Sequence, residues 1–277
     1  MRSVLVAVLT LSLIGCATTV PYTGVGPYPQ MERGAPIPPI DVLGNILALP
    51  GKLILWSWKF DNHAISTQTE DKLIEYLEAR KLPALKAARF QLNEYNPGQD
   101  LSRLVHNPYV AWPYRVLLGA PITLVFDVLL PGRLFPWGDY YNPFTNTVHL
   151  FSDHPAVALH EAGHAHDFAK RHFKGTYAAL RLLPFVDLYQ EWQASAEAIG
   201  YLKDAPDHAT EINAYKILYP AYGTYVGSYF FPPIGTIGGA LLGHATGRSE
   251  AAMRAHHYET LESSPATTSP PPSSSAP

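Results

Sequence analysis

The apolar positions of this 277-residue chain recur with helical spacing in some segments and with strand spacing in others. Helical spacing is present in residues 66–81, 153–170 and 186–201, and strand spacing in residues 87–95 and 147–151. In the first of these helices Leu73, Ile74 and Leu77 share one face after a Ser/Thr start. The pattern predicts an α+β fold that is mainly helical, with a small mixed sheet beside the helix of residues 153–170.

The two ends of the chain differ in composition from its middle. Residues 16–41 are rich in proline and glycine, which predicts a tether. Residues 263–277 contain only Ser, Pro, Thr and Ala, and we expect them to be disordered. Residues 42–262 then form one globular domain, long enough to bury a sizeable core.

Three segments of this domain are more apolar than a small soluble domain requires. They are residues 42–58, 116–130 and 222–242. Proline or glycine interrupts each of them, so none predicts a convincing membrane-spanning helix. We expect these segments to lie in the core or to line a surface that rests on a bilayer.

Glycine recurs at every fourth position near the end of the domain. The residues are Gly235, Gly239, Gly243 and Gly247, within residues 222–248. This spacing permits close helix approach in a membrane, or a glycine-rich helix packed within a soluble domain. We favour the packed helix because His244, Thr246 and Arg248 interrupt the apolar run.

Charge and cysteine content exclude several classes of protein. The formal net charge is -3 at pH 7 and no basic cluster is present, so nothing indicates binding to nucleic acid. Cys16 is the single cysteine of the chain. Neither a disulfide framework nor a cysteine-based metal site is therefore possible, which leaves histidine and carboxylate side chains as metal ligands.

The first residues have the pattern of an export signal. Residues 1–3 are basic in character and residues 4–14 are apolar, which is too short for a membrane span and predicts a signal peptide of residues 1–15. Residues 13–16, Leu-Ile-Gly-Cys, resemble a bacterial lipobox. The resemblance implies acylation of Cys16 and a lipid-anchored protein of the bacterial cell envelope. Because Ala17 follows, the outer membrane is the expected site where the cell has one.

Residues 160–164 read His-Glu-Ala-Gly-His, an H-E-x-x-H motif inside the predicted helix of residues 153–170. Four residues of α-helix return a side chain to nearly the same face, so His160 and His164 can bind one metal ion. Glu161 lies beside them and can act on a metal-bound water. The motif resembles that of the zincin metallopeptidases. The resemblance implies a zincin-like fold, a zinc ion and a catalytic Glu161.

A catalytic zinc ion usually has three protein ligands, and the third is less evident here. Asp167 lies on the histidine face but one turn further along, where orienting an imidazole suits it better than binding the metal. Residues 191–195, Glu-Trp-Gln-Ala-Ser, resemble the E-x-x-A-[D/S] helix of the gluzincin branch, with serine where aspartate is common. The resemblance implies Glu191 as the third ligand. Glu197 remains the alternative.

The same resemblance implies how the site would act. An oxyanion donor is expected, and the candidates are Tyr215, Tyr219, Tyr222 and His149. Residues 147–151 form either an edge strand that can hold an extended peptide or an ordinary core strand. We predict a zinc-dependent metallopeptidase, a hydrolase that cleaves protein or peptide substrates in the envelope. Two alternatives remain: an inactive zincin-fold lipoprotein that serves as a binding or scaffold protein, and a membrane-associating protein driven by the glycine repeat, with a structural metal site.

Overall fold

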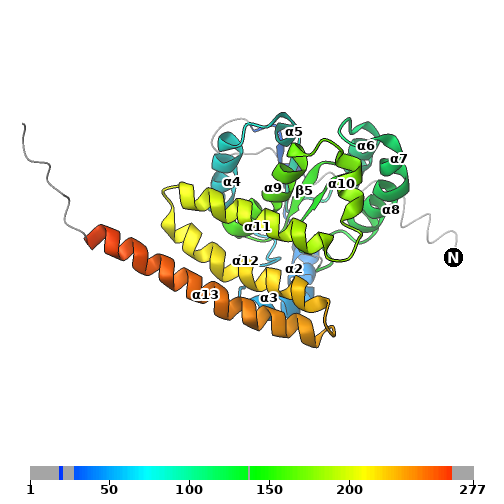
Figure 1. The fold of residues 1–277 in the computed structure, drawn as a ribbon. Helices are drawn as coiled ribbons and strands as arrows, with labels where there is room; N and C mark the ends of the chain where they lie inside the picture. Colours follow the sequence, from blue (N-terminus) through cyan, green and yellow to red (C-terminus); the bar gives the residue numbers. More distant parts are fainter. Residues whose placement is uncertain (1–18, 21–27, 137, 264–277) are drawn as a thin grey trace, which may run out of the picture.

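The computed structural model describes residues 19–20, 28–136 and 138–263. The predicted signal peptide of residues 1–15, the predicted lipidation site Cys16 and nearly all of the predicted C-terminal tail lie outside these residues. Within the described part, helices predominate and the strands form one small mixed sheet, which confirms the expected α+β class (Figure 1).

The sheet has five strands in the order β1-β2-β3-β5-β4. The strands are β1 (Thr19–Val20), β2 (Met31–Gly34), β3 (Arg89–Leu92), β4 (Tyr140–Asn142) and β5 (Thr147–Leu150). Strands β2, β3 and β5 are parallel, and the two outer strands run antiparallel to their neighbours. Because β2 pairs with β3, residues 31–34 belong to the folded domain. The prediction of a tether through residue 41 was wrong for them.

Of the two possibilities for residues 147–151, the structure has the core strand. Strand β5 lies inside the sheet, between β3 and β4, and all four of its residues are buried. The edge is β4, which precedes β5 and joins it by a turn in which Asn146 has a φ of 52°. Alternation and β-branching describe a strand but not its neighbours, so the sequence pattern could not separate an inner strand from an outer one.

Helices supply most of the remaining structure. They are α2 (Pro38–Leu47), α3 (Leu49–Leu55), α4 (Thr67–Ala79), α5 (Pro83–Lys86), α6 (Pro97–His106), α7 (Trp112–Tyr114), α8 (Ala120–Ile122), α9 (Pro155–Lys170), α10 (Lys174–Leu180), α11 (Val186–Asp204), α12 (His208–Ser228) and α13 (Ile234–Ser263). Helix α9 packs against β4, β5, α4, α11 and α12, and buried Leu73, Phe90, Leu159 and Leu202 join these elements in the main core. Helices α11, α12 and α13 lie side by side below α9 (Figure 1).

Helix α9 begins at Pro155, and His154 occupies its N-cap position without a side-chain capping hydrogen bond. Asp153, one residue earlier, does not cap this helix. The Asp153 carboxylate instead accepts hydrogen bonds from the Ser66 amide at 2.9 Å, the Ser66 hydroxyl at 2.6 Å and the Thr69 hydroxyl at 2.8 Å. It therefore fixes the start of α4 beside the start of α9.

The glycine repeat lies where α12 and α13 pack against each other. A Cβ atom on Gly239 would lie 2.0 Å from the Gly223 carbonyl oxygen, and one on Gly243 would lie 2.4 Å from that of Tyr219. Both contacts are far shorter than van der Waals separation, so only glycine allows this approach. The repeat thus serves packing between two helices of the same domain.

Candidate metal centre

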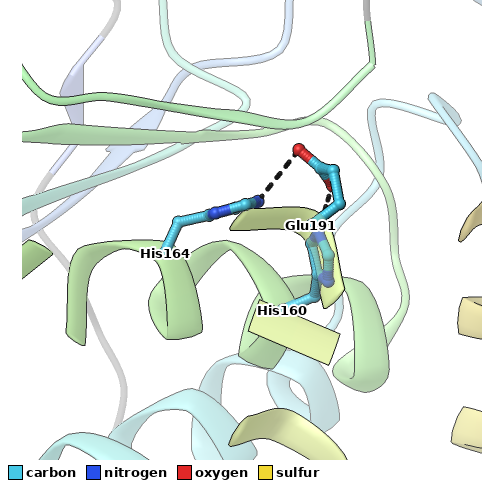
Figure 2. A group of neighbouring side chains, drawn as sticks. All are labelled: His160, His164 and Glu191. Atoms are coloured by element: carbon cyan, nitrogen blue, oxygen red, sulfur yellow. Dashed lines mark hydrogen bonds and ion pairs between the residues drawn. The ribbon is translucent and has the colours of Figure 1, made fainter. Parts of the chain in front are cut away.

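Two neighbouring helices bring three potential metal ligands together. His160 and His164 project from α9, and Glu191 projects towards them from α11 (Figure 2). The Nε2 atom of His160 lies 3.1 Å from Glu191 Oε2, and the Nε2 atom of His164 lies 3.3 Å from Oε1 of the same carboxylate. One ligand atom from each residue lies within 4.8 Å of the other two. The spacing is that of ligands around a single ion.

Small residues allow the two helices to approach so closely. A Cβ atom on Gly163 would lie 2.8 Å from the Ala194 carbonyl oxygen, which is too close for any side chain. Ala162, Ala194 and Ala198 are fully buried at the same contact. Glycine lowers the helix propensity of α9. At this position, however, it allows α11 to approach closely enough to present Glu191 to the two histidines.

Polar contacts hold the ligands in place. The Ser195 hydroxyl lies 3.1 Å from His160 Nδ1, on the side of the ring away from Glu191. Arg181, at the end of α10, forms an ion pair with Glu191 and lies 3.2 Å from the Gln190 side-chain oxygen. A hydrogen bond to the second ring nitrogen of a histidine fixes its orientation and leaves the first nitrogen free for a metal.

Burial and neighbouring charges together determine the protonation of the site. Burial lowers the pKa of His164 to about 4, so this imidazole is neutral near pH 7 and able to bind a metal ion. Burial raises the pKa of Glu161 to about 8, although the nearby His160 opposes the shift. Burial alone would also raise the pKa of Glu191, but the two histidines and Arg181 outweigh it and lower that pKa. The site thus combines an ionised ligand carboxylate with a second carboxyl group that holds its proton more tightly.

The donor set fits zinc. Two imidazole nitrogens and one carboxylate are ligands that a catalytic zinc ion takes, whereas calcium and magnesium prefer oxygen ligands alone. The ligands also face open space. A cavity of ≈ 510 Å³ is lined by Glu161, His164 and Glu191, and a second of ≈ 300 Å³ by His160, Glu161 and Glu191. A reacting group can therefore reach the ligands from two directions.

The alternative metal ligands lie elsewhere. Glu197 Oε1 lies 2.7 Å from Arg80 Nε and 3.0 Å from His166 Nδ1, and it takes no part in the group formed by Glu191. Asp167 lines the larger cavity but accepts hydrogen bonds from Arg171 and Tyr177. The Glu197 and Asp167 carboxylates are therefore each engaged by neighbouring side chains other than the two histidines of the motif.

The four candidate oxyanion donors differ in whether they line the cavities beside the metal ligands. Tyr222 lines the smaller cavity, whereas Tyr215 and Tyr219 are not among the described residues that line either one. Sequence reasoning missed Tyr225, which lines both cavities and whose pKa is raised by the charge of Glu191 and by burial. The sequence could have indicated Tyr225, because it follows the candidate Tyr222 by one helical turn and shares its face.

His149, the fourth candidate, lies in a different buried group. Its Nε2 atom lies 3.8 Å from Asp127 Oδ1, and Asp100 completes a second set of three ligand atoms within 4.8 Å of one another. Burial lowers the pKa of His149 to about 3. His149 therefore belongs to this buried polar group, and it is not among the described residues that line either cavity around Glu191.

Comparison with known proteins gives no relative for this arrangement. No family model, no curated protein and no solved structure matches the chain.

Proposed function

We propose that this protein is a zinc-dependent metallopeptidase of the gluzincin type, anchored by a lipid on Cys16 in a bacterial cell envelope. One observation carries the proposal: His160, His164 and Glu191 converge from two helices beside Glu161, at the border of two cavities. A metal site that was purely structural would more often be closed on all sides.

The residues divide the chemistry among them. When bound, zinc supplies a Lewis acid that activates water and polarises a carbonyl group. The positive charge of a bound zinc ion would oppose the effect of burial and lower the pKa of Glu161. The ionised carboxylate would then take a proton from the attacking water and later donate it to the leaving amine. Tyr225 lines both cavities. Its hydroxyl would donate a hydrogen bond to the oxyanion that develops on the substrate. Ser195 keeps the His160 ring in its binding orientation.

The cavity favours an extended chain as substrate. Residues 140–144, which include the edge strand β4, line the larger cavity together with Glu161 and His164. An edge strand offers main-chain groups that can pair with a peptide by β-augmentation. A peptide held this way would pass the zinc ligands with its own main chain exposed to them.

Metal analysis tests the site itself. We expect about one zinc ion per chain from residue 17 onward by elemental mass spectrometry, as a single three-ligand site requires. Glu191→Ala should lose most of it. Glu197→Ala is the matched control, because this carboxylate lies on the same helix but binds Arg80. Zinc retained in the first variant and lost in the second would reverse the assignment.

Peptide cleavage tests the enzyme. A mixture of random peptides, analysed by mass spectrometry, should yield new termini with the wild-type chain and none after treatment with a chelator. Glu161→Gln should keep its zinc and lose cleavage by a factor of about 10² or more, since it removes the general base. A wild-type protein that binds zinc but cleaves nothing would support the scaffold alternative instead.

A further inference from the structure

Most of the exposed large apolar side chains among the described residues lie on four segments of the molecule. The segments are α2–α3 with the residues just after it, the helical run of residues 112–129, the link between α10 and α11, and the turn between α12 and α13. Examples are Leu53, Trp58, Leu117, Leu182, Phe231 and Ile234. Phe231 is 86% exposed and Trp58 is 68% exposed, values that a soluble monomer seldom shows for so many large residues together.

In two of these segments the charged residues point inward and the apolar residues point outward. Helices α2 and α3 carry only Asp41 and Lys52 as charged residues. Asp41 binds Arg133 at 2.8 Å, and Lys52 is 2% exposed and donates to the Asp61 carbonyl oxygen at 3.3 Å. This distribution is the reverse of that on a water-exposed amphipathic helix.

The run of residues 112–129 repeats this arrangement. It consists of α7, η1 (Arg115–Gly119), α8 and η2 (Thr123–Leu129), and only 22% of it is buried inside the molecule. Its acidic residue, Asp127, is buried and accepts hydrogen bonds from Tyr140 at 2.8 Å and Asn142 at 2.7 Å. Its basic residue, Arg115, donates to the Leu104 carbonyl oxygen at 2.8 Å. Inward ionisable groups and an outward apolar face are characteristic of protein in contact with lipid.

The lengths of these apolar helices favour a surface that lies in the membrane interface over a bundle of membrane-spanning helices. Among the described residues the run 112–129 alone is long and apolar enough to cross a bilayer, and α2 with α3 would count as a second span only if taken as one helix. The two are bent by 51° relative to each other, and α2 has 10 residues and α3 has 7. Each is far shorter than the roughly 20 residues that a span needs.

The apolar segments surround the approaches to the metal centre. Phe126 and Leu182 are partly exposed and also line the larger cavity. Ile54 of α3 and Thr236 of α13 line the smaller one. In Figure 1 α2, α3 and the turn between α12 and α13 lie on the lower side of the molecule, away from the free end of α13.

Chain length places the expected lipid anchor beside this surface. Thr19 in β1 pairs with Gly34, four residues before α2 begins at Pro38. Cys16 precedes Thr19 by three residues, and an extended chain covers at most about 11 Å over that length. The acyl chain proposed on Cys16, on which this step rests, would begin within that reach of β1, which favours lipid over a protein partner as the occupant of the apolar surface.

We propose that α2–α3 with the residues just after it, the run 112–129 and the turn between α12 and α13 form an interfacial membrane-binding surface. The surface holds the domain on a phospholipid bilayer independently of the lipid anchor and directs the cavities of the metal centre towards that bilayer. Exposed Trp56, Trp58 and Trp112 suit this role, since tryptophan concentrates at the membrane–water boundary. Vesicle binding by this surface needs neither zinc nor peptidase activity.

Flotation with vesicles of phosphatidylethanolamine and phosphatidylglycerol tests the proposal. The polypeptide of residues 17–277, without an acyl group, should float with the vesicles at both low and high salt. Trp58→Glu, Leu117→Glu and Phe231→Glu should each weaken partitioning at least tenfold, since burial of a large apolar side chain is worth about one to two factors of ten. Leu261→Glu is the control, because this residue is exposed at the far end of α13.

The outcomes are distinct. Each variant changes an exposed side chain, so far-ultraviolet circular dichroism and thermal unfolding should match the wild type and exclude misfolding as the cause. Glu191→Ala should float as the wild type does, which separates this proposal from the assignment of the metal site. A polypeptide that remains in the aqueous fraction would overturn the proposal, and so would an equal loss with Leu261→Glu. A stable dimer in solution that does not bind vesicles would assign the surface to a second copy of the chain.

Discussion

At the scale of single residues, Ser195 shows how much of the site depends on side chains beyond the three ligands. Its hydroxyl holds His160 Nδ1 at 3.1 Å, and it comes from the helix that also carries Glu191. Ser195→Ala should therefore weaken zinc binding by about tenfold, because the ring loses its fixed orientation. Competition with a chromophoric chelator measures this. Gln193→Ala, on the same helix but outside the metal group, should bind zinc as the wild type does.

Glu197 gives a prediction about pH. Burial alone would raise its pKa, but the contacts with His166 and Arg80 outweigh burial and lower the pKa to about 2. A folded-state pKa below the unfolded one means that the contribution to stability is complete above the unfolded value of about 4.5 and is lost as pH falls towards 2. Glu197→Gln should lower the free energy of unfolding at neutral pH by about 1–2 kcal/mol, allowing for solvent screening.

Urea titrations across this pH range check the prediction. The difference between the wild type and Glu197→Gln should shrink as the pH is lowered from neutral towards 2. A constant difference at every pH would mean that the variant acts through packing and not through charge. Glu262→Gln is a suitable control, because this side chain is exposed at the end of α13.

The residues of the site were predictable to different degrees. The periodicity of α9 places His160 and His164 on one face by helix geometry alone. The choice of Glu191 over Glu197 rested on a resemblance, since both lie on one helix. What separates them is Arg80, which binds Glu197 from 117 positions away in the chain, and no local pattern contains such a contact.

At the scale of elements, the packing of α12 against α13 depends on the identity of particular glycines. Gly239 lies against the Gly223 carbonyl oxygen, whereas the adjacent Gly238 has no atom within 4 Å of an added Cβ. Gly239→Ala should therefore destabilise the domain by about 2 kcal/mol or more through overpacking. Gly238→Ala should stabilise it by about 0.5–1 kcal/mol, because alanine is the better helix former.

This pair of variants is compared by urea unfolding. Both add one methyl group to the same helix, so a difference in sign isolates the close contact from helix propensity. Equal effects of the two substitutions would show that α12 and α13 separate easily and that the glycines do not determine their approach.

The sequence predicted the individual helices and strands better than it predicted which of them pair or pack together. The helices near residues 66–81 and 186–201 follow from apolar spacing, and the structure has them at Thr67–Ala79 and Val186–Asp204. The place of β5 inside the sheet does not follow, because it depends on pairing with β3, more than fifty residues earlier. Likewise Asp153 binds Ser66 across 87 positions and not the helix beside it.

At the scale of the whole molecule, the three candidate metal ligands bring together helices from two parts of the chain. Helix α9 packs on the sheet, and α11 connects it to the layer of α12 and α13. A metal ion bound between α9 and α11 would add its binding free energy to the stability of the fold, since the unfolded chain does not hold the three ligands together. Zinc bound at this site should therefore raise the thermal stability of the domain, whether or not the protein is an enzyme.

Thermal unfolding with and without a chelator tests this coupling. At a zinc concentration 1,000-fold above the dissociation constant, binding should stabilise the fold by about 4 kcal/mol, which raises the Tm of a domain of this size by roughly 10 °C. The shift should vanish in Glu191→Ala and persist in Glu161→Gln, because the latter changes the general base and leaves the ligands intact. A chelator that abolishes peptide cleavage without lowering the Tm would indicate zinc bound to substrate or to one helix only. It would then be wrong to treat the convergence of α9 and α11 on Glu191 as the metal centre.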